Sequence, residues 1–245
     1  MKTIISPAKN MVTIDNIKKP IIKENIKPQT IEIYNKLKNF NVGDFSAYMN
    51  VNNDIALKSF IYYQDIDFEG FGTPAIFSYN GIQYKNIEPF SFNDDDISFA
   101  SNHISIISAF YGLLKADTPI QPYRLEMGGK INFDGENLYK LWGTSIYCEL
   151  FKNETTVLNL ASDEYSKAIK PFLNDNDNFI TVKFMKYSKG KYKTFATDAK
   201  ISRGKMVNFI VKNKINNLED IKNFCENDYN FSENFSDKNN FVFCK

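Results

Sequence analysis

Arginine is the residue whose rarity first points to chemistry in this chain. The sequence of 245 residues contains 30 basic residues, and only Arg124 and Arg203 are arginines. Because lysine is used wherever positive charge alone suffices, these two positions indicate a need for the guanidinium group itself. A guanidinium presents a planar fork of N–H donors that matches carboxylate or phosphate, and it stays charged when it leaves water. Both arginines are therefore candidates for lining an anion-binding cleft.

Arg124 lies in a segment, residues 121–128, that combines a proline, aromatic and charged residues, and a glycine. Such a composition resists both helix and regular strand, and irregular charged segments on a rigid scaffold often form sites. A structural alternative stays open. Glu126 follows two residues later, so on an extended segment it would share a face with Arg124 and pair with it.

Arg203 and Lys200 lie three residues apart on a predicted helix that Asp198 caps and that ends near Asn213. Residues at this spacing share one helix face. Both lie near the N-terminal end of the helix, where their charge adds to the helix dipole and favours an anion. Ser6 and Lys9 directly follow a predicted strand, the place where α/β proteins bind ligands. An ordinary turn explains that pair equally well.

Three acids and a tyrosine are candidates for acid–base work, namely Glu126, Asp163, Glu164 and Tyr165. The last three begin a predicted helix, and a structural reading makes Ser162 its N-cap with acids in the first turn. The sequence therefore leaves open whether the protein is an enzyme. With His103 as the single histidine and three scattered cysteines, we expect no metal site and no cofactor.

The elements that must position these residues alternate between strand and helix, which predicts one mixed α/β domain over residues 1–245. The expected strands cover residues 2–5, 74–79, 104–108 and 156–160, a hairpin of 179–187 with 191–197, and an edge strand at 241–243. The expected helices cover residues 30–40 with Thr30 as cap, 44–62 with a break near Asn52-Asn53, a helix opened by Asn93 and three aspartates, 136–153 and 198–213.

The charge of the whole chain, +1, favours no partner, but its distribution is uneven. Residues 183–214 contain ten basic residues and one acid, which predicts a basic surface for an anionic partner. No apolar run approaches the ~20 residues needed to span a membrane. The first residues also lack the apolar core of a signal peptide. We therefore expect a cytoplasmic protein with no membrane partner.

Several of these segments together resemble the YaaA family of peroxide stress resistance proteins, over essentially the whole chain. The segments that carry the resemblance are Ser6-Pro7-Ala8-Lys9, Tyr111-Gly112, residues 121–128, Leu138-Tyr139 with Trp142-Gly143, residues 159–165, and Arg203-Gly204 with Met206. The resemblance implies a mixed sheet with flanking helices, a positively charged cleft and a helix-hairpin-helix-like element, here residues 30–62. It also implies survival of peroxide through less free iron and less damage to DNA.

Two hypotheses for function follow. In the first, the protein binds double-stranded DNA without reading its sequence, through a basic cleft of Ser6, Lys9, Arg124, Lys200 and Arg203. In the second, it is an enzyme that acts on a small phosphorylated or carboxylated substrate in the same cleft, with the acids named above as acid–base candidates. The shape of the cleft discriminates between them. A closed pocket favours a small ligand, and an open groove as wide as a duplex favours DNA.

Overall fold

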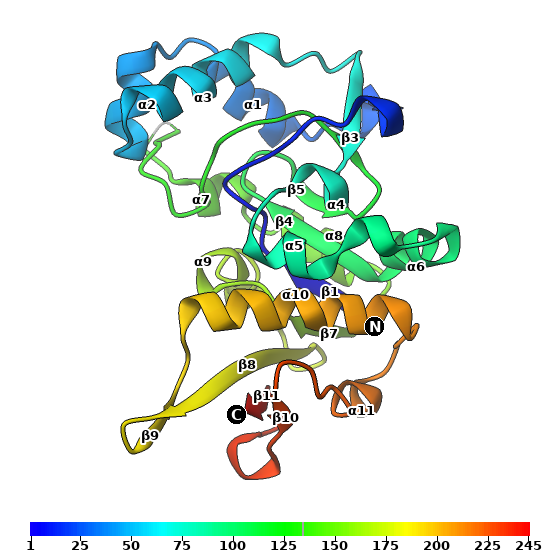
Figure 1. Cartoon of the computed structure of the whole chain (residues 1–245). Helices are drawn as coiled ribbons and strands as arrows, with labels where there is room; N and C mark the ends of the chain where they lie inside the picture. Colours follow the sequence, from blue (N-terminus) through cyan, green and yellow to red (C-terminus); the bar gives the residue numbers. More distant parts are fainter. Residues whose placement is uncertain (134) are drawn as a thin grey trace.

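The fold is built on a mixed sheet of eight strands, and the computed structural model describes residues 1–133 and 135–245 (Figure 1). Five parallel strands form its centre, in the order β11 (Asn240–Cys244), β8 (Asn178–Ser188), β7 (Thr156–Asn159), β1 (Lys2–Ile5) and β4 (Ile104–Ser108). Antiparallel strands flank them, namely β5 (Gly112–Lys115) beside β4, β10 (Asn230–Phe231) beside β11 and β9 (Lys191–Lys193) beside β8. Every residue of β4 is buried, as expected for a central strand covered on both faces.

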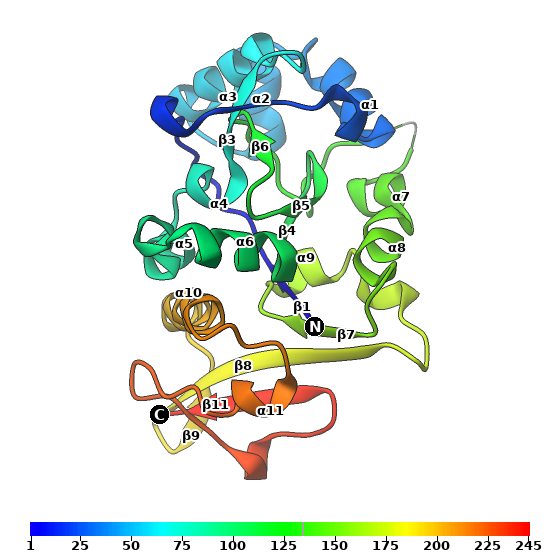
Figure 2. The same cartoon turned by 90° about the vertical axis from the view of Figure 1, so that its right-hand side faces the viewer.

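Helices cover both faces of this sheet. Figure 2 shows α5, α6 and α10 on one side of β1 and β4, and α7, α8 and α9 on the other, with α1 to α3 packed at one end. The α-helices are α1 (Pro28–Leu37), α2 (Val42–Met49), α3 (Asn53–Asp65), α4 (Ala75–Ser78), α5 (Ile82–Ile87), α6 (Asp94–His103), α7 (Leu138–Trp142), α8 (Ser145–Phe151), α9 (Asp163–Ser166), α10 (Ala196–Lys212) and α11 (Leu218–Ile221). A small antiparallel sheet of β2 (Lys19–Pro20), β3 (Phe71–Pro74) and β6 (Pro119–Ile120) lies beside α4. The mixed α/β architecture expected from the sequence is confirmed.

The expected strand over residues 74–79 was wrong, because the chain turns into the short helix α4 after β3. Five of these six residues are buried, so the run shows neither strand nor helix periodicity. The N–H groups of Ala75 and Ile76 donate to the carbonyls of Thr118 and Ala116 at 2.8 and 2.9 Å. These long-range bonds, rather than a local pattern, determine the backbone here.

The expected helix over residues 136–153 is interrupted, since α7 ends at Trp142 and α8 begins at Ser145. Gly143 has φ +48°, a conformation that favours glycine and breaks the helix. Trp142 donates its indole N–H to the carbonyl of Ala109 at 2.9 Å. The break allows this buried side chain to pack under the sheet while α8 turns away.

Two of the expected N-caps, Thr30 and Asp198, were wrong. Helix α1 begins at Pro28, the position that proline favours, and the Thr30 hydroxyl instead donates to the Phe110 carbonyl at 2.9 Å. Helix α10 begins at Ala196, so that Asp198 lies in its first turn. At the start of α1, a long-range hydrogen bond therefore takes the hydroxyl that was expected to cap the helix.

The strand expected at the sheet edge, residues 241–243, is also placed differently. It forms part of β11, which lies between β8 and the two-residue strand β10. Two local predictions are confirmed. Asn93 caps α6 in a reciprocal pair with Asp96, and the hairpin turns at Lys189 and Gly190, which both have positive φ. The second strand of the hairpin, expected to reach residue 197, ends at Lys193 because the chain enters α10 at Ala196. Residues 30–62 fall on α1, α2 and α3, and their role as a nucleic-acid-binding hairpin stays a prediction.

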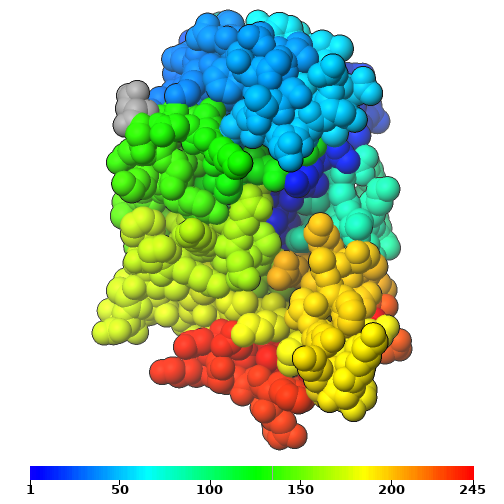
Figure 3. Space-filling model, turned by 90° about the vertical axis from the view of Figure 1, so that its left-hand side faces the viewer, coloured from blue at the N-terminus to red at the C-terminus, as the bar shows by residue number. Residues whose placement is uncertain are grey.

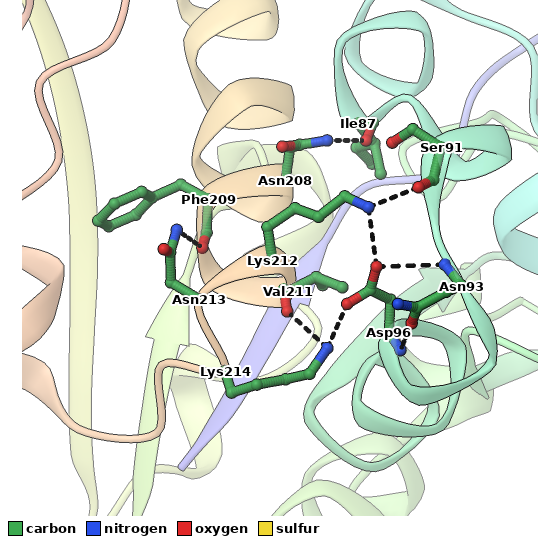
Figure 4. A network of polar contacts seen from close by, with 10 residues as sticks. All are labelled: Ile87, Ser91, Asn93, Asp96, Asn208, Phe209, Val211, Lys212, Asn213 and Lys214. Atoms are coloured by element: carbon green, nitrogen blue, oxygen red, sulfur yellow. Dashed lines mark hydrogen bonds and ion pairs between the residues drawn. The ribbon is translucent and has the colours of Figure 1, made fainter.

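Helix α10 is held in place at two points along its length. At its C-terminal end, Lys212 and Lys214 both reach the carboxylate of Asp96 in α6, the former at 2.8 Å (Figure 4). Nearer its middle, a Cβ at Gly204 would lie 2.2 Å from the backbone oxygen of Gln83 in α5. Only glycine permits this approach, and it brings Arg203 against α5.

Candidate functional site

The candidate site lies where the chain reverses its path through the sheet. The chain leaves β1 toward β4 on one side, and it leaves β7 toward β8 on the other. The loops that follow β1 and β7 therefore separate, and ligands of α/β proteins bind in the crevice left at such a switch point. A cavity of about 410 Å³ opens here. Figure 3 shows it as a hollow in which blue N-terminal atoms lie between green, teal and orange parts of the chain.

Three chain segments line this cavity, residues 6–10, 80–84 and 123–126, together with the N-terminal parts of α9 and α10. The structure brings together nearly all of the residues singled out in the sequence, namely Ser6, Lys9, Arg124, Glu126, Glu164, Tyr165, Lys200 and Arg203. Asp163 is the exception. Its side chain is fully exposed and pairs with Lys170 at 3.4 Å, so it lies outside the cavity and is no longer a candidate for acid–base work there.

Ser6 joins the two walls of the switch point. Its hydroxyl oxygen accepts a hydrogen bond from the backbone N–H of Ser162 at 2.9 Å and donates to the Ser162 hydroxyl at 3.3 Å. The hydroxyl of Tyr84 donates to the Ser6 carbonyl at 3.0 Å. Ser162 is the N-cap residue of α9, as expected, but its side chain makes no capping bond. The Ser162 hydroxyl instead accepts the hydrogen bond from Ser6 at the cavity wall.

Arg124 and Glu126 pair as the structural reading predicted, and they do so inside the cavity. Oε1 of Glu126 lies 3.5 Å from Nη2 of Arg124 and 2.7 Å from Nζ of Lys9. Arg124 also donates from Nη1 to the Lys9 carbonyl at 3.4 Å. The segment is irregular and not a strand. One carboxylate thus offsets two cations, which leaves this corner of the cavity positively charged.

Arg203 has no such partner. Among residues 1–133 and 135–245, no carboxylate lies within 4.0 Å of its guanidinium, and its buried Nε has no hydrogen-bond acceptor. Burial lowers the pKa of Arg203 from its ordinary value, against an opposing effect of the Asp163 charge. A buried charge without a partner is costly. Arg203 therefore marks the position where the cavity best accommodates an anion.

Glu164 and Tyr165, which line the cavity from α9, are both restrained. Oε1 of Glu164 accepts the backbone N–H of Gly128 at 3.0 Å, and the Glu164 carbonyl accepts the hydroxyl of Tyr139 at 2.9 Å. Burial raises the pKa of Tyr165 well above its ordinary value, so this phenol stays protonated at neutral pH. Tyr165 can donate a hydrogen bond to a ligand, but it is not a base there.

Gln83 is a cavity residue that the sequence did not single out. Its side chain is 8% exposed, and its buried Nε2 has no acceptor in the described part of the chain. A glutamine is uncharged and belongs to no motif here, so the sequence offers no reason to select it. What identifies Gln83 as a candidate is the burial of its unpaired amide, which only the folded structure reveals.

Metal ligands are not gathered in the described part of the chain. Within residues 1–133 and 135–245, no three His, Cys, Asp or Glu side chains lie close enough to hold an ion together. No described helix combines the length and the apolar composition that crossing a bilayer requires. The chemistry that the cavity does offer is a set of N–H donors and cations with too few acceptors, which suits an anionic ligand.

The fold and the site together define a class of protein. It is an α/β protein with helices on both faces of a mostly parallel sheet and a basic cavity at the switch point. The family model of the peroxide stress protein YaaA matches residues 1–235, and the chain belongs to this family.

Relatives align along the whole chain. It is 40% identical over 246 residues to a UPF0246 protein of Clostridioides difficile (strain 630) and 41% identical over 250 residues to one of Ligilactobacillus salivarius (strain UCC118). Both alignments cover 100% of each chain. It is also 37% identical to a UPF0246 protein of Desulfitobacterium hafniense (strain Y51), with 100% of this chain and 98% of the relative covered. The family resemblance drawn from the sequence is confirmed.

Proposed function

We propose that this member of the peroxide stress protein family binds a small phosphorylated or carboxylated ligand in the switch-point cavity. The observation that carries the proposal is Arg203, a buried guanidinium that lines the cavity without a carboxylate partner among the described residues. A protein keeps such a group where a ligand supplies the missing charge, because an Arg–phosphate or Arg–carboxylate pair is strong and directional.

The charge of the cavity supports a dianion. Four cationic side chains line it, Lys9, Arg124, Lys200 and Arg203, against the two carboxylates of Glu126 and Glu164. The net charge of these groups is therefore about +2. A phosphate monoester near neutral pH carries a charge of about −1.5 to −2, and a dicarboxylate carries −2. Either ligand class would neutralise the cavity.

The size of the cavity supports a small molecule over a duplex. Pockets for small ligands have volumes of roughly 300–1,000 Å³, and this one measures about 410 Å³. If the bound molecule reacts, Glu126 or Glu164 is the candidate base, since Tyr165 stays protonated and could act only as an acid. Both carboxylates are held in place by N–H donors or cations.

Ligand binding is tested on the full chain by thermal unfolding with inorganic phosphate, pyrophosphate and citrate. A ligand at about 100 times its Kd stabilises a protein by about 2.7 kcal/mol, which corresponds to several degrees in Tm. We expect such a rise for the wild type and for Lys191→Ala, whose position is exposed and outside the cavity, and a smaller rise for Arg203→Lys. No rise with any of the three anions would contradict the proposal.

Double-stranded DNA is a second candidate partner, and a different surface favours it. The β8–β9 hairpin carries exposed Lys186, Lys189 and Lys191 beside Tyr187 and Tyr192, whose side chains are 57% and 39% exposed. The helical element at residues 30–62 offers less, because the carboxylate of Asp44 accepts the N–H of Asn41 at 2.8 Å. An acid thus occupies a donor that a phosphate would need.

DNA binding through these lysines is tested by its dependence on salt. The logarithm of affinity should fall linearly with the logarithm of salt concentration, with a slope of about −0.9 for each phosphate neutralised. Combined replacement of Lys186, Lys189 and Lys191 by Ala should reduce the slope by about 3, whereas Arg203→Lys should leave it unchanged. Absence of binding at low salt would remove this candidate.

Either partner, the cavity ligand or DNA, could account for a role in survival of peroxide stress. We propose that occupancy of the cavity or binding to DNA limits iron-mediated damage, and a survival assay distinguishes the two. Cells that carry Arg203→Lys should lose resistance to peroxide if the cavity ligand is responsible. Cells that carry the lysine replacements in the β8–β9 hairpin should lose it if DNA is responsible. Loss of resistance in neither would contradict both routes.

A further inference from the structure

We infer that the ligand is a nucleoside-monophosphate-like phosphate monoester, with the phosphate on the basic groups and the base edge on Gln83. The inference rests on the proposed function, since it names the organic part of the same anionic ligand. It starts from the buried polar atoms of the cavity that make no hydrogen bond among the described residues, all of which are nitrogen donors. The buried nitrogens Nε2 of Gln83, Nε of Arg124 and Nε of Arg203 are all donors without acceptors in the described chain.

Gln83 is the group that a bare anion does not explain. Its side chain is more than nine-tenths buried and neutral, so it adds no charge to the attraction of a phosphate. Leaving a buried amide unpaired costs stability, which indicates that the amide is kept for a ligand. An amide has donors on nitrogen and an acceptor on oxygen, and either orientation presents both kinds of group. The edge of a nucleic-acid base presents the same combination.

Gln83 and Arg203 form one continuous wall. Gly204, the neighbour of Arg203, packs directly on the backbone of Gln83, with an ideal Cβ 2.2 Å from its carbonyl oxygen. Helices α5 and α10 are therefore in direct contact here, and the side chains of Gln83 and Arg203 line the same cavity. A single ligand that places its phosphate at Arg203 is near enough to place a second group at Gln83.

Two tyrosines add apolar surface to the cavity, which suits the base of a nucleotide. Tyr84 and Tyr123 line the cavity, and their hydroxyls are engaged elsewhere. The hydroxyl of Tyr84 donates to the Ser6 carbonyl at 3.0 Å, and that of Tyr123 lies 2.7 Å from the Ser108 hydroxyl. The hydroxyls are therefore not available to a ligand, and the rings, each 3% exposed, add a small apolar surface to the cavity wall.

The volume of the cavity agrees with a ligand larger than phosphate. A phosphate group has five heavy atoms and fills only a small part of about 410 Å³. The space left over borders Gln83, the tyrosine rings and the side chains of Ile82 and Leu125. This combination of one charged end, one amide and apolar rings matches a phosphorylated nucleoside better than a dicarboxylate, which has no planar body.

The test measures binding of six compounds to the full chain by calorimetry. Four are the 5′-monophosphates of adenosine, guanosine, cytidine and uridine. Ribose 5-phosphate keeps the phosphate and sugar without a base, and inorganic phosphate keeps the charge alone. We expect at least one nucleoside monophosphate to bind about tenfold more tightly than ribose 5-phosphate, the gain of roughly one well-formed buried hydrogen bond.

Gln83→Met is the informative variant, because it keeps the size of the side chain and removes the amide. We expect it to lower nucleoside monophosphate affinity about tenfold and to leave ribose 5-phosphate affinity unchanged. Removal of an unpaired buried amide should also raise Tm by about 2 °C or more, an effect opposite to that of a structural hydrogen bond. The matched control is Gln64→Met, since Gln64 is exposed and donates to the Lys38 carbonyl at 2.9 Å.

The outcomes separate this inference from the function on which it rests. If no nucleoside monophosphate binds more tightly than ribose 5-phosphate, or if Gln83→Met weakens both equally, the inference is wrong. Ribose 5-phosphate binding that Arg203→Lys weakens would then still support the small-anion function. If neither ribose 5-phosphate nor inorganic phosphate binds the wild type, and citrate does not raise its Tm, the proposed function itself fails.

Discussion

Ser6 and Ser162 lie 156 positions apart in the chain, yet the Ser6 hydroxyl accepts the backbone N–H of Ser162 at 2.9 Å. The two residues follow the adjacent parallel strands β1 and β7. Their contact connects the loops that diverge at the switch point. Both residues line the cavity that Arg203 also lines, so this contact fixes one part of the cavity wall.

Replacement of Ser6 tests whether this contact organises the cavity. Ser6→Ala removes the acceptor for the Ser162 N–H, and an unsatisfied buried donor costs about 1–3 kcal/mol. We expect Tm to fall by about 2 °C or more, with weaker binding of anions in the cavity. Ser98→Ala is the control, because Ser98 is exposed on α6. Equal effects of the two substitutions would show that the contact contributes nothing.

The two arginines should respond differently to conservative replacement by lysine. Within residues 1–133 and 135–245, Arg203 has no carboxylate partner. Arg203→Lys should therefore lower anion affinity about tenfold to a hundredfold, the loss of a charge-assisted hydrogen bond. Its Tm without ligand should not fall. Arg124→Lys should lower both affinity and Tm, since Arg124 also bonds the Lys9 carbonyl and pairs with Glu126. Unchanged affinity in both variants would refute the argument from arginine rarity.

Gly204 should be sensitive to a single methyl group. In a helix interior, Gly→Ala ordinarily stabilises by roughly 1 kcal/mol, but here the added Cβ would lie 2.2 Å from the Gln83 carbonyl oxygen. We expect Gly204→Ala to destabilise the protein by about 1–3 kcal/mol, measured by urea unfolding. Gly128→Ala is the comparison, because the nearest atoms to its Cβ are at 3.6 Å. A gain in stability for Gly204→Ala would mean that α5 and α10 are not packed this closely.

Asp96 should make stability depend on pH in acid. Hydrogen bonds from Lys212 and Lys214 hold its pKa well below the ordinary value. The unfolded chain therefore takes up the proton first, near pH 4, and the stabilisation present above that pH is lost as pH falls further. At pH 7, Asp96→Asn should cost about 1.5–3 kcal/mol.

The pH profile distinguishes this charge effect from a packing effect. The difference in unfolding free energy between wild type and Asp96→Asn should shrink as pH is lowered from 5 toward 2. Asp15→Asn serves as control, because Asp15 pairs with Lys18 while its side chain is 89% exposed, and such pairs contribute little. A difference that stays constant with pH would show that the charge of Asp96 is not responsible.

Much of the fold was predictable where the signal was local. The cap at Asn93, the turn at Lys189-Gly190 and the strand over residues 104–108 each depend on a few neighbouring residues, and each was confirmed. The segment at residues 74–79 failed for the opposite reason. Its residues are buried almost throughout, so no periodicity was left to distinguish strand from helix.

The sequence alone determined which residue types were available for chemistry and where the chain would place most of them. Two arginines among many lysines indicated an anion site, and polar residues after strand ends indicated its location, because both arguments depend only on side-chain chemistry and on strand order. Tertiary structure alone decided that Glu164 lies in the cavity while the adjacent Asp163 lies in solvent. Successive residues on a helix point about 100° apart, so the packing of α9 settles which carboxylate faces inward. The same is true of Gln83, whose amide became informative only once the packing of α5 against α10 had buried it without a partner.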